Sequence, residues 1–286
     1  MRVARLETKR VIEMRVFLPK ADFKAVFAHF ARKGKVTGER TIKSYYFDAF
    51  HPTNGRFVLQ GARGKYRFRE RTDGGRTVFR LQGKARTAAT TFPTVDGYAF
   101  SVRRTQAWSQ DLAPAAARKL RRHAQKAAEA FDQGHKAFAE QAARAGQTFT
   151  KAEGAYQRFF HRRLGERKAK AEHVSFAGLL TDTRTQLDRL FTRGGVGYTL
   201  ELDRFKLATA PGKSVREFSL EASIEPSRNA ATTRKHVREV MHDVVRRLKA
   251  IGVQAEAVIP ARKAASDPLG PTGGYMAPVR KVLAGR

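Results

Sequence analysis

The sequence contains no cysteine and no apolar run near the roughly 20 residues that a membrane helix needs. The missing cysteine excludes disulfides and thiolate metal sites, and it favours a reducing compartment. The segment from Met1 to Arg10 is basic, but Glu13 and Arg15 interrupt the apolar core that a secretory signal would have. We therefore expect a soluble, intracellular protein, with the cytoplasm as the favoured location.

Acidic residues are scarce. The chain of 286 residues has 26 Asp and Glu against 57 Lys and Arg, a formal net charge of +31. Such an imbalance concerns partners rather than fold, and it indicates nucleic acid, polyphosphate, nucleotides or an anionic membrane face. Hydrophobic residues make up 41% and include 20 Phe, so the chain can form a core and is not a wholly disordered basic tail.

The first third of the chain has the pattern of an antiparallel meander. Alternating residues predict a half-buried strand over 10–18, and helical spacing of Phe predicts a helix over 22–33. Strand-like runs follow at 42–47, 57–60, 65–71, 76–84 and 98–104, separated by turn signals such as Asp73-Gly-Gly75. We therefore expect residues 1–111 to form the first half of a sheet domain.

The composition changes at Leu112. Residues 112–180 are rich in Ala, Lys, Arg, Gln and Glu, which predicts a basic helical insertion. Strands are expected to resume near Thr181, with clear runs at 197–207 and 214–225, and an amphipathic helix follows at 232–250. We assign 181–258 to the second half of the sheet domain and 259–286, rich in Pro and Gly, to a flexible basic tail.

Charge is arranged by strand face. Along 65–71, Lys65, Arg67, Arg69 and Arg71 fall on one face, with Tyr66, Phe68 and Glu70 on the other. A row of cations repels itself unless a polyanion lies along it. The same alternation places Arg80, Gln82 and Lys84 on one face, then Thr199, Glu201 and Asp203, then Glu217, Ser219, Glu221, Ser223 and Glu225.

A sheet with one face in water would explain any single strand of this kind. It explains the set less well, because cations gather on some strands and acids on others. If the sheet closes, the charged faces meet inside a barrel. Guanidinium forks would bind phosphate oxygens there, and carboxylates would hold a bridging divalent metal. We therefore predict an α+β fold with an antiparallel β-barrel, or tunnel, flanking helices and a helical insertion.

Four stretches between Val11 and Glu225 resemble the triphosphate tunnel metalloenzyme superfamily. This superfamily includes CYTH-type phosphatases, RNA 5′-triphosphatases and the polyphosphate polymerase domain of vacuolar transporter chaperone proteins. The stretches are Val11–Arg15, similar to an opening Glu-x-Glu-x-Lys strand; Ser44–Asp48 with Gly64–Arg69, similar to Tyr-Phe-Asp and Arg-x-Arg; Val78–Gly83; and the closing strands around Leu187–Arg189, Leu200–Arg204 and Leu220–Ser223.

The resemblance implies a site as well as a fold. The cations that it places on phosphate are Arg15, Arg67, Arg69, Arg80, Lys84, Arg103 and Arg189. It places Mg²⁺ or Mn²⁺ on Glu13, Glu201 and Glu221, and it assigns no catalytic residue. The implied substrates are a nucleoside triphosphate, polyphosphate or RNA, processed by a tripolyphosphatase-like or a polyphosphate polymerase-like enzyme.

The sequence also departs from the phosphatase pattern. Val11 replaces the first glutamate, Ser223 replaces one of the closing acids, and Gln82 stands where a lysine is usual. Three hypotheses stay open: a triphosphate or polyphosphate enzyme, an RNA 5′-triphosphatase, and a non-catalytic binder of nucleic acid or polyanions in a ribonucleoprotein or viral particle. The cations of the insertion, from Arg118 to Lys170, are either a solvated helix face or a docking surface for nucleic acid or an acidic membrane.

Overall fold

The computed structural model describes residues 7–33, 35–51, 56–57, 64–153, 174–258 and 276–285. The strands are β1 (Glu7–Leu18), β2 (Lys35–His51), β3 (Arg56–Phe57), β4 (Gly64–Asp73), β5 (Arg76–Arg86), β6 (Thr94–Val95), β7 (Tyr98–Ala99), β8 (Ser101–Asp111), β9 (Val174–Phe191), β10 (Gly197–Ala210) and β11 (Lys213–Ile224). The α-helices are α1 (Lys20–Lys33), α3 (Pro114–Asp132), α4 (Phe138–Glu153), α6 (Ala230–Lys249) and α7 (Ala277–Leu283).

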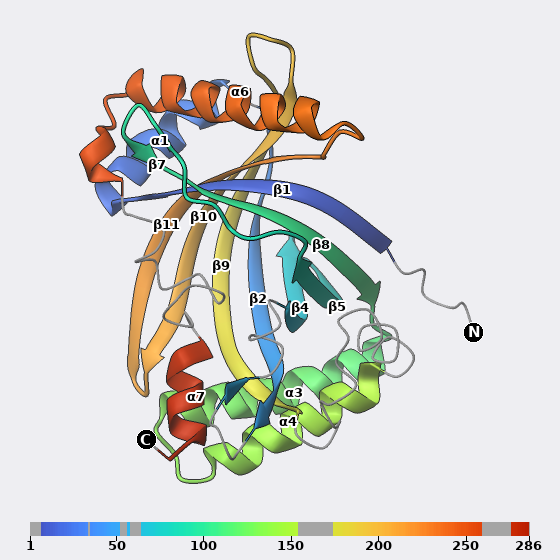
Figure 1. Cartoon of the computed structure of the whole chain (residues 1–286). Coiled ribbons are helices and arrows are strands. Elements are labelled where there is room, and N and C mark those ends of the chain that lie inside the picture. The colour runs from blue at the N-terminus through green and yellow to red at the C-terminus, as the bar shows by residue number, and fades with distance from the viewer. Residues whose placement is uncertain are drawn as a thin grey trace.

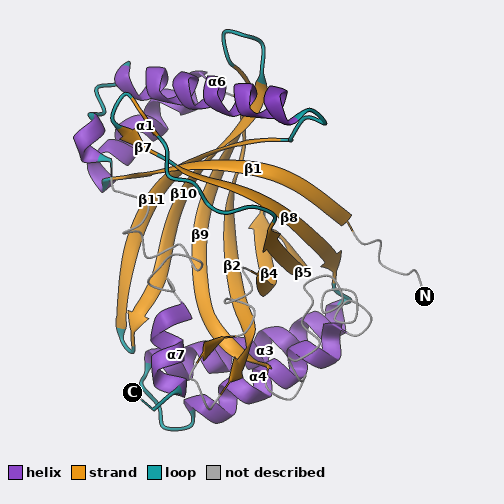
Figure 2. Cartoon of the chain, viewed as in Figure 1, coloured by secondary structure: helices purple, strands orange, loops and turns teal. Residues whose placement is uncertain are grey.

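Eight long strands form a closed antiparallel barrel. Neighbours pair in the order β2, β4, β5, β8, β1, β11, β10, β9, and a further pairing of β9 with β2 closes the circle. Figures 1 and 2 show the barrel with helices at two opposite sides and the insertion outside it. The predicted α+β fold with a tunnel-like antiparallel barrel is confirmed.

The barrel is polar inside and apolar outside. On β4, Tyr66 and Phe68 point outward and are almost fully buried, while Lys65, Arg67 and Arg69 line the interior. This inversion follows from the two-residue period of a strand: one face of every strand points to the lumen and the other to the covering helices. The apolar core therefore lies between barrel and helices, and the lumen is left to charged side chains.

Two separate hydrophobic cores hold the helices against the barrel. One joins α3 and α4 to the outer faces of β2, β4 and the first part of β9. The other joins α1 and α6 to the outer faces of β1, β10 and β11. In Figure 1 the α3–α4 pair lies below the barrel and α6 lies above it.

The insertion reaches the barrel through small residues. Proline begins α3, and its buried stripe is mostly Ala and Leu120, which allows close approach to the sheet. In α4, a Cβ at Gly146 would come within 1.8 Å of the carbonyl oxygen of Val174, so glycine is required where α4 crosses the start of β9. Arg121 of the insertion is paired with the outward-facing Glu70 at 3.2 Å, so at least this cation has a packing role.

Two boundaries differ from the sequence-based expectation. Strand β9 begins at Val174, before the expected return of strands near Thr181, and runs unbroken to Phe191. The end of the chain is also structured, because α7 inserts Met276 and Val279 into the core beside α3, α4 and β10. Within the residues that the structure describes, no helix is both long and apolar enough to span a bilayer.

Candidate functional site: the barrel lumen

A cavity of about 200 Å³ lies inside the barrel, and every one of the eight barrel strands contributes side chains to it. Eight of the predicted site residues meet there: Glu13, Arg15, Arg67, Arg69, Lys84, Arg103, Glu201 and Glu221. They come together because inward-facing positions of strands far apart in sequence share one lumen once the sheet closes.

Three cations of β4 form what we call the cationic wall: Lys65, Arg67 and Arg69. Within the described part of the chain, none of them is paired with a carboxylate. Arg67 donates to neutral groups alone: its Nε lies 2.6 Å from Gln82 Oε1, and its Nη1 lies 3.2 Å from Tyr46 Oη. The Gln82 that replaces the usual lysine thus orients Arg67 without neutralising it.

Burial lowers the pKa of two members of this wall, Lys65 and Arg69. Chiefly through loss of hydration, and then through the nearby Lys84 and Arg67, the pKa of Lys65 falls to about 7. Burial, Arg67 and Arg184 likewise lower the pKa of Arg69. The carboxylates that act on these two groups, Glu13 on Lys65 and both Glu201 and Asp182 on Arg69, oppose the shifts without outweighing the loss of hydration.

Across the lumen lies what we call the acidic wall: Asp182, Glu201, Asp203 and Glu221, from β9, β10 and β11. Arg184 binds three of these carboxylates. Its Nε lies 2.7 Å from Asp203 Oδ1, its Nη2 lies 3.3 Å from Asp182 Oδ2, and its Nη1 contacts Glu201. Arg15 contacts Glu221 and lies 3.6 Å from Asp203. Two guanidinium groups therefore serve four acids.

The pKa shifts of this wall follow from its pairing and burial. Burial acts to lower the pKa of Arg15, but Glu221 and Asp203 raise it above its usual value, and the acids around Arg184 do the same there. Burial raises the pKa of Asp182 and Asp203, against the opposing effect of Arg184. The acidic wall thus holds two arginines charged and in fixed positions, while one oxygen of Asp182, Oδ1, stays buried without a hydrogen-bond partner in the described structure.

Glu13 and Lys84 form a third pair in the lumen. Burial alone would raise the pKa of Glu13, but the Lys84 ammonium, with Arg15 and Arg103 nearby, lowers it to about 2. Arg103 lies directly opposite Glu13 in the β1–β8 register, and its Nε donates to Ser101 Oγ at 3.1 Å.

One predicted phosphate ligand, Arg80, lies outside the lumen cavity, and a second, Arg189, is not described at the side-chain level. Arg80 lies at one mouth of the barrel and binds Asp111, with Nε 2.5 Å from Oδ1. Arg80 lies on the same face of β5 as Gln82 but two residues nearer the start of the strand, and this places it at the mouth. The mouth is a hollow of about 420 Å³ that shares Arg69 and Gln82 with the lumen and adds Arg71 and Arg76. Arg189 belongs to β9, but its side chain is outside what the structure describes.

Each of the three predicted metal ligands forms an ion pair with a basic side chain of the protein. Glu13 binds Lys84, Glu201 binds Arg184, and Glu221 binds Arg15. Oxygen ligands of this kind suit Mg²⁺ or Mn²⁺. Among the residues that the structure describes, however, no three His, Asp or Glu side chains are grouped to hold a metal ion. In this arrangement the three carboxylates do not fit a metal site.

Sequence reasoning missed Asp182 and Arg184, which are central to the acidic wall. The stretch Thr181–Gln186 is polar on both faces, so it lacks the apolar alternation that marks a half-buried strand. The signal that remained was the pair Asp182-x-Arg184 at strand spacing. Lys65, also in the lumen, was expected in the row of cations but was not named as a phosphate ligand, and Tyr46 belonged to a noted motif without a role.

Comparison with known proteins rests on structure, since no protein-family model and no curated protein matches the chain. A candidate adenylyl cyclase from Hippeastrum, described as having a dominant triphosphatase activity, superposes with a TM-score of 0.52 at 12% identity, covering 84% of this chain and 88% of that one. The protein has the triphosphate tunnel fold. The resemblance seen in the sequence is thereby confirmed at the level of fold.

Two further similar structures are described as triphosphatases. The Mimivirus capping enzyme triphosphatase has a TM-score of 0.41 at 9% identity, covering 84% of this chain and 90% of that one. The Schizosaccharomyces pombe RNA triphosphatase has a TM-score of 0.34 at 10% identity, covering 85% and 81%. Similarity at this level says nothing of activity, so any activity of this chain has to be argued from its own lumen.

Proposed function

We propose that the protein binds a linear triphosphate or polyphosphate chain inside the barrel and processes it. The observation that carries this proposal is the cationic wall: three half-buried cations that line the lumen of the barrel and have no carboxylate partner among the described residues. Buried charges are costly unless they are paired. A polyanion supplies the missing partner for all three at once.

The spacing of the wall favours a chain of phosphates over a single ion. Lys65, Arg67 and Arg69 occupy alternate positions of one strand, so their backbone origins span roughly 13 Å at 3.3 Å per residue. Arg71 and Arg76 continue the cations to the mouth. A linear polyanion could thus lie along β4 with one end in the lumen and the other toward the mouth.

The residues suit phosphoryl chemistry by positioning and charge neutralisation. Arg67 presents a guanidinium fork that Gln82 and Tyr46 hold in place. Arg15 and Arg184, fixed by the acidic wall, face the same lumen and stabilise charge that develops on phosphate oxygens. Asp182 is the carboxylate best suited to orient a water or hold a proton, because its Oδ1 is buried without a hydrogen-bond partner and burial raises its pKa.

Hydrolysis and transfer to a growing phosphate chain both use such a lumen, so a tripolyphosphatase-like and a polyphosphate polymerase-like reaction are both included in the proposal. Mg²⁺ or Mn²⁺ on Glu13, Glu201 and Glu221 stays a prediction, and it requires those carboxylates to leave Lys84, Arg184 and Arg15. The expected cytoplasmic location stays a prediction as well.

A direct test incubates the purified protein with tripolyphosphate, ATP and 5′-triphosphate RNA, with and without Mn²⁺. Released phosphate identifies a hydrolase, and long-chain products on a gel identify a polymerase. The Arg67→Ala variant should lose turnover and bind tripolyphosphate roughly 30-fold or more weakly, as expected for an unpaired buried charge contact. Arg216→Ala, which removes an exposed arginine of β11, is the matched control. Unchanged affinity and turnover in a folded Arg67→Ala protein would reject the proposal.

A second candidate function is a binding module without catalysis. It is favoured by the ion pairs that occupy Glu13, Glu201 and Glu221. In that case the same assays give no turnover, and tripolyphosphate still binds with an affinity that Mn²⁺ does not change. Arg67→Ala would weaken this binding too, so the two functions differ in turnover and metal dependence.

A further inference from the structure

A cavity of about 790 Å³, which we call the outer cavity, lies on the outside of the barrel beside α6. Its base is the outward face of β1 and β8, where Ile12 is paired with Arg104 in the strand register. Residues 88–96, which follow β5, line one side of it, and α6 lines the other. The volume is in the range of cavities that hold small molecules in proteins.

The interior of the outer cavity is aliphatic. Val102 of β8 and Val237 of α6 are half-buried, and both lie at the edge of the core that joins α6 to the barrel. Ile12, Val95 and Met241 continue the same surface and are almost fully buried. Among the described lining residues there is no Phe, Tyr or Trp. The cavity therefore suits an alkyl chain better than a nucleobase, which proteins commonly hold by stacking on an aromatic ring.

Three arginines line the same cavity. Arg104 extends from β8, and Arg234 and Arg238 extend from α6, where they are four residues apart. All three are exposed, and none forms an ion pair or a side-chain hydrogen bond with any residue that the structure describes. The two arginines of α6 repel each other at this spacing. An anionic group held among the three would relieve that repulsion.

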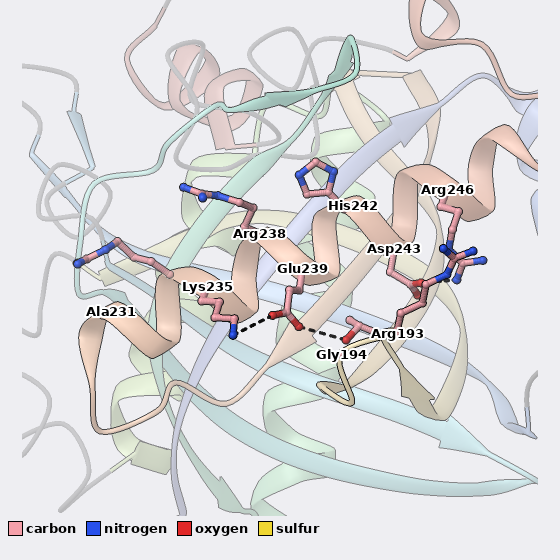
Figure 3. A pocket seen from close by; sticks show the side chains of 11 residues that line it. Arg193, Gly194, Ala231, Lys235, Arg238, Glu239, His242, Asp243 and Arg246 are labelled. Carbon is pink, nitrogen blue, oxygen red and sulfur yellow. Dashed lines mark hydrogen bonds and ion pairs between the residues drawn. The ribbon is translucent and has the colours of Figure 1, made fainter.

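The acids near these arginines are paired with other groups. Asp96, the one acid in the described lining, accepts from Lys249 Nζ at 2.7 Å. Glu239 of α6 accepts from the start of the β9–β10 turn. Figure 3 shows Arg238 leaving the helix on the side away from Glu239 and that turn. The described acids around the outer cavity thus leave its arginines for an external anion.

We propose that the outer cavity binds an anionic amphiphile, a small molecule with one alkyl chain and a terminal carboxylate or phosphate. The alkyl chain lies along Val102 and Val237, and the three arginines bind the head group. Apolar burial and guanidinium contacts both contribute to affinity. A fatty acid and an alkyl phosphate share this chemistry, whereas a nucleotide or an inorganic phosphate chain has no alkyl part for the cavity. This binding is independent of the proposed lumen chemistry.

The outer cavity lies back to back with the lumen. Ile12 and Arg104 line the outer cavity, whereas their chain neighbours Glu13 and Arg103 line the lumen. One sheet thickness therefore separates the two sites, and they share no lining residue in the described structure. Substitutions in the outer cavity consequently leave the lining of the lumen as it is, so the two sites can be tested separately.

The test is isothermal titration calorimetry of the full chain with monomeric decanoate, below the concentration at which it forms micelles. Octanoate should bind about tenfold more weakly, because it has two fewer methylenes to bury. Acetate and 1-decanol should each bind at least about tenfold more weakly than decanoate, because each has only one of the two required parts. Equal affinity for octanoate and decanoate, or tighter binding of AMP than of decanoate, would overturn the proposal.

Two variants separate the head-group contacts from the apolar contacts. R104A/R238A should weaken decanoate binding about fivefold and leave 1-decanol binding unchanged, because it removes only charge. Ala89→Trp places a large ring in the cavity from an exposed position, so it should abolish binding of both molecules. The replaced side chains are exposed, and thermal melting checks the fold. Wild-type affinity for decanoate in a folded Ala89→Trp protein would place the amphiphile elsewhere and reject the assignment.

The matched control is R193A/K235A. It removes two exposed cations that line the neighbouring cavity between α6 and the β9–β10 turn but do not line the outer cavity. Decanoate affinity should change less than twofold in this control, and tripolyphosphate affinity should stay unchanged in every variant. An equal loss in the control would mean diffuse attraction by net charge and would overturn the proposal. Binding to phosphatidylglycerol vesicles with none to monomeric decanoate would overturn it too, because the arginines would then belong to a membrane-binding surface.

Discussion

The two walls of the lumen are built from the same kinds of residue on the same kind of strand, yet they differ in pairing. On the acidic wall, Arg184 and Arg15 are surrounded by carboxylates that raise their pKa values. On the cationic wall, Lys65, Arg67 and Arg69 form no ion pair with a carboxylate among the described residues. Burial lowers the pKa of Lys65 to about 7. The cations of both walls are half-buried, so it is pairing with carboxylates that separates the acidic wall from the wall for which we propose phosphate binding.

From this difference we expect the acidic wall to contribute folding stability and the cationic wall to contribute ligand affinity. The acidic wall contributes order: it fixes two guanidinium groups before any ligand arrives. The cationic wall opposes folding of the empty protein, because unpaired charges lose hydration. A bound polyanion reverses that loss, so stability should rise with ligand by mass action. The following experiments test this division.

The largest effect is expected from breaking the acidic wall. Arg184→Ala leaves Asp182, Glu201 and Asp203 without their shared cation. Removing one partner of a buried ion pair costs about 3–5 kcal/mol, and urea denaturation should show a loss of that size. In an R184A/D203N double variant, part of the loss should return, because one buried charge has been removed with its partner. Equal stability of wild type and Arg184→Ala would show that the wall is not paired as described.

On the cationic wall the same kind of change should act with opposite sign. Lys65→Met removes an unpaired buried charge, so the empty protein should become more stable at pH 7 by about 2 kcal/mol or more. The folded pKa of about 7 lies below the unfolded value, so the unfolded state binds the proton more tightly. The wild type should therefore gain stability as pH rises from 7 toward 10.5, and Lys65→Met should lack that part of the gain. A Lys65→Met protein less stable than wild type would contradict the comparison.

Phosphate binding should follow the protonation of Lys65. Above pH 7 the Lys65 amine of the empty protein is largely neutral, because its pKa is about 7. A bound polyanion raises this pKa, so Lys65 takes up a proton when the polyanion binds. Tripolyphosphate affinity should fall between pH 7 and 9 by at most about tenfold per unit. Isothermal titration calorimetry in two buffers of different ionisation enthalpy would show the proton uptake. Lys65→Met should show a flatter pH profile, and an identical pH profile in the two proteins would exclude Lys65 as the source.

The smallest effect is expected at the boundary between the walls. Glu13→Gln frees Lys84 from its partner and adds a cation to the binding side. Tripolyphosphate affinity without added metal should rise about threefold, in line with a modest charge contact. If Glu13 instead holds Mg²⁺ or Mn²⁺, the same variant loses metal-dependent turnover with no gain in affinity. This experiment therefore separates the paired arrangement seen here from the predicted metal site.

Much of the site could be predicted from sequence. The alternation of Lys65, Arg67 and Arg69 against Tyr66 and Phe68 predicted which face of β4 lines the barrel, because burial of one strand face leaves a clear two-residue period. The failures have a physical reason as well. Around Asp182 and Arg184 both faces are polar, so no period marks the strand, and α7 lacked any signal of the core into which Val279 packs.

The local sequence sets which side chains share a face of each strand, because side chains alternate between the two faces along a strand. It therefore determined that Lys65, Arg67 and Arg69 lie together, and that Glu201 lies on the same face as Asp203. The tertiary structure alone decided that Arg184 and Arg15 neutralise the acids while the cations of β4 stay unpaired. That outcome depends on the register between strands far apart in sequence and on closure of β9 against β2, and neither is encoded in the pattern of any one strand.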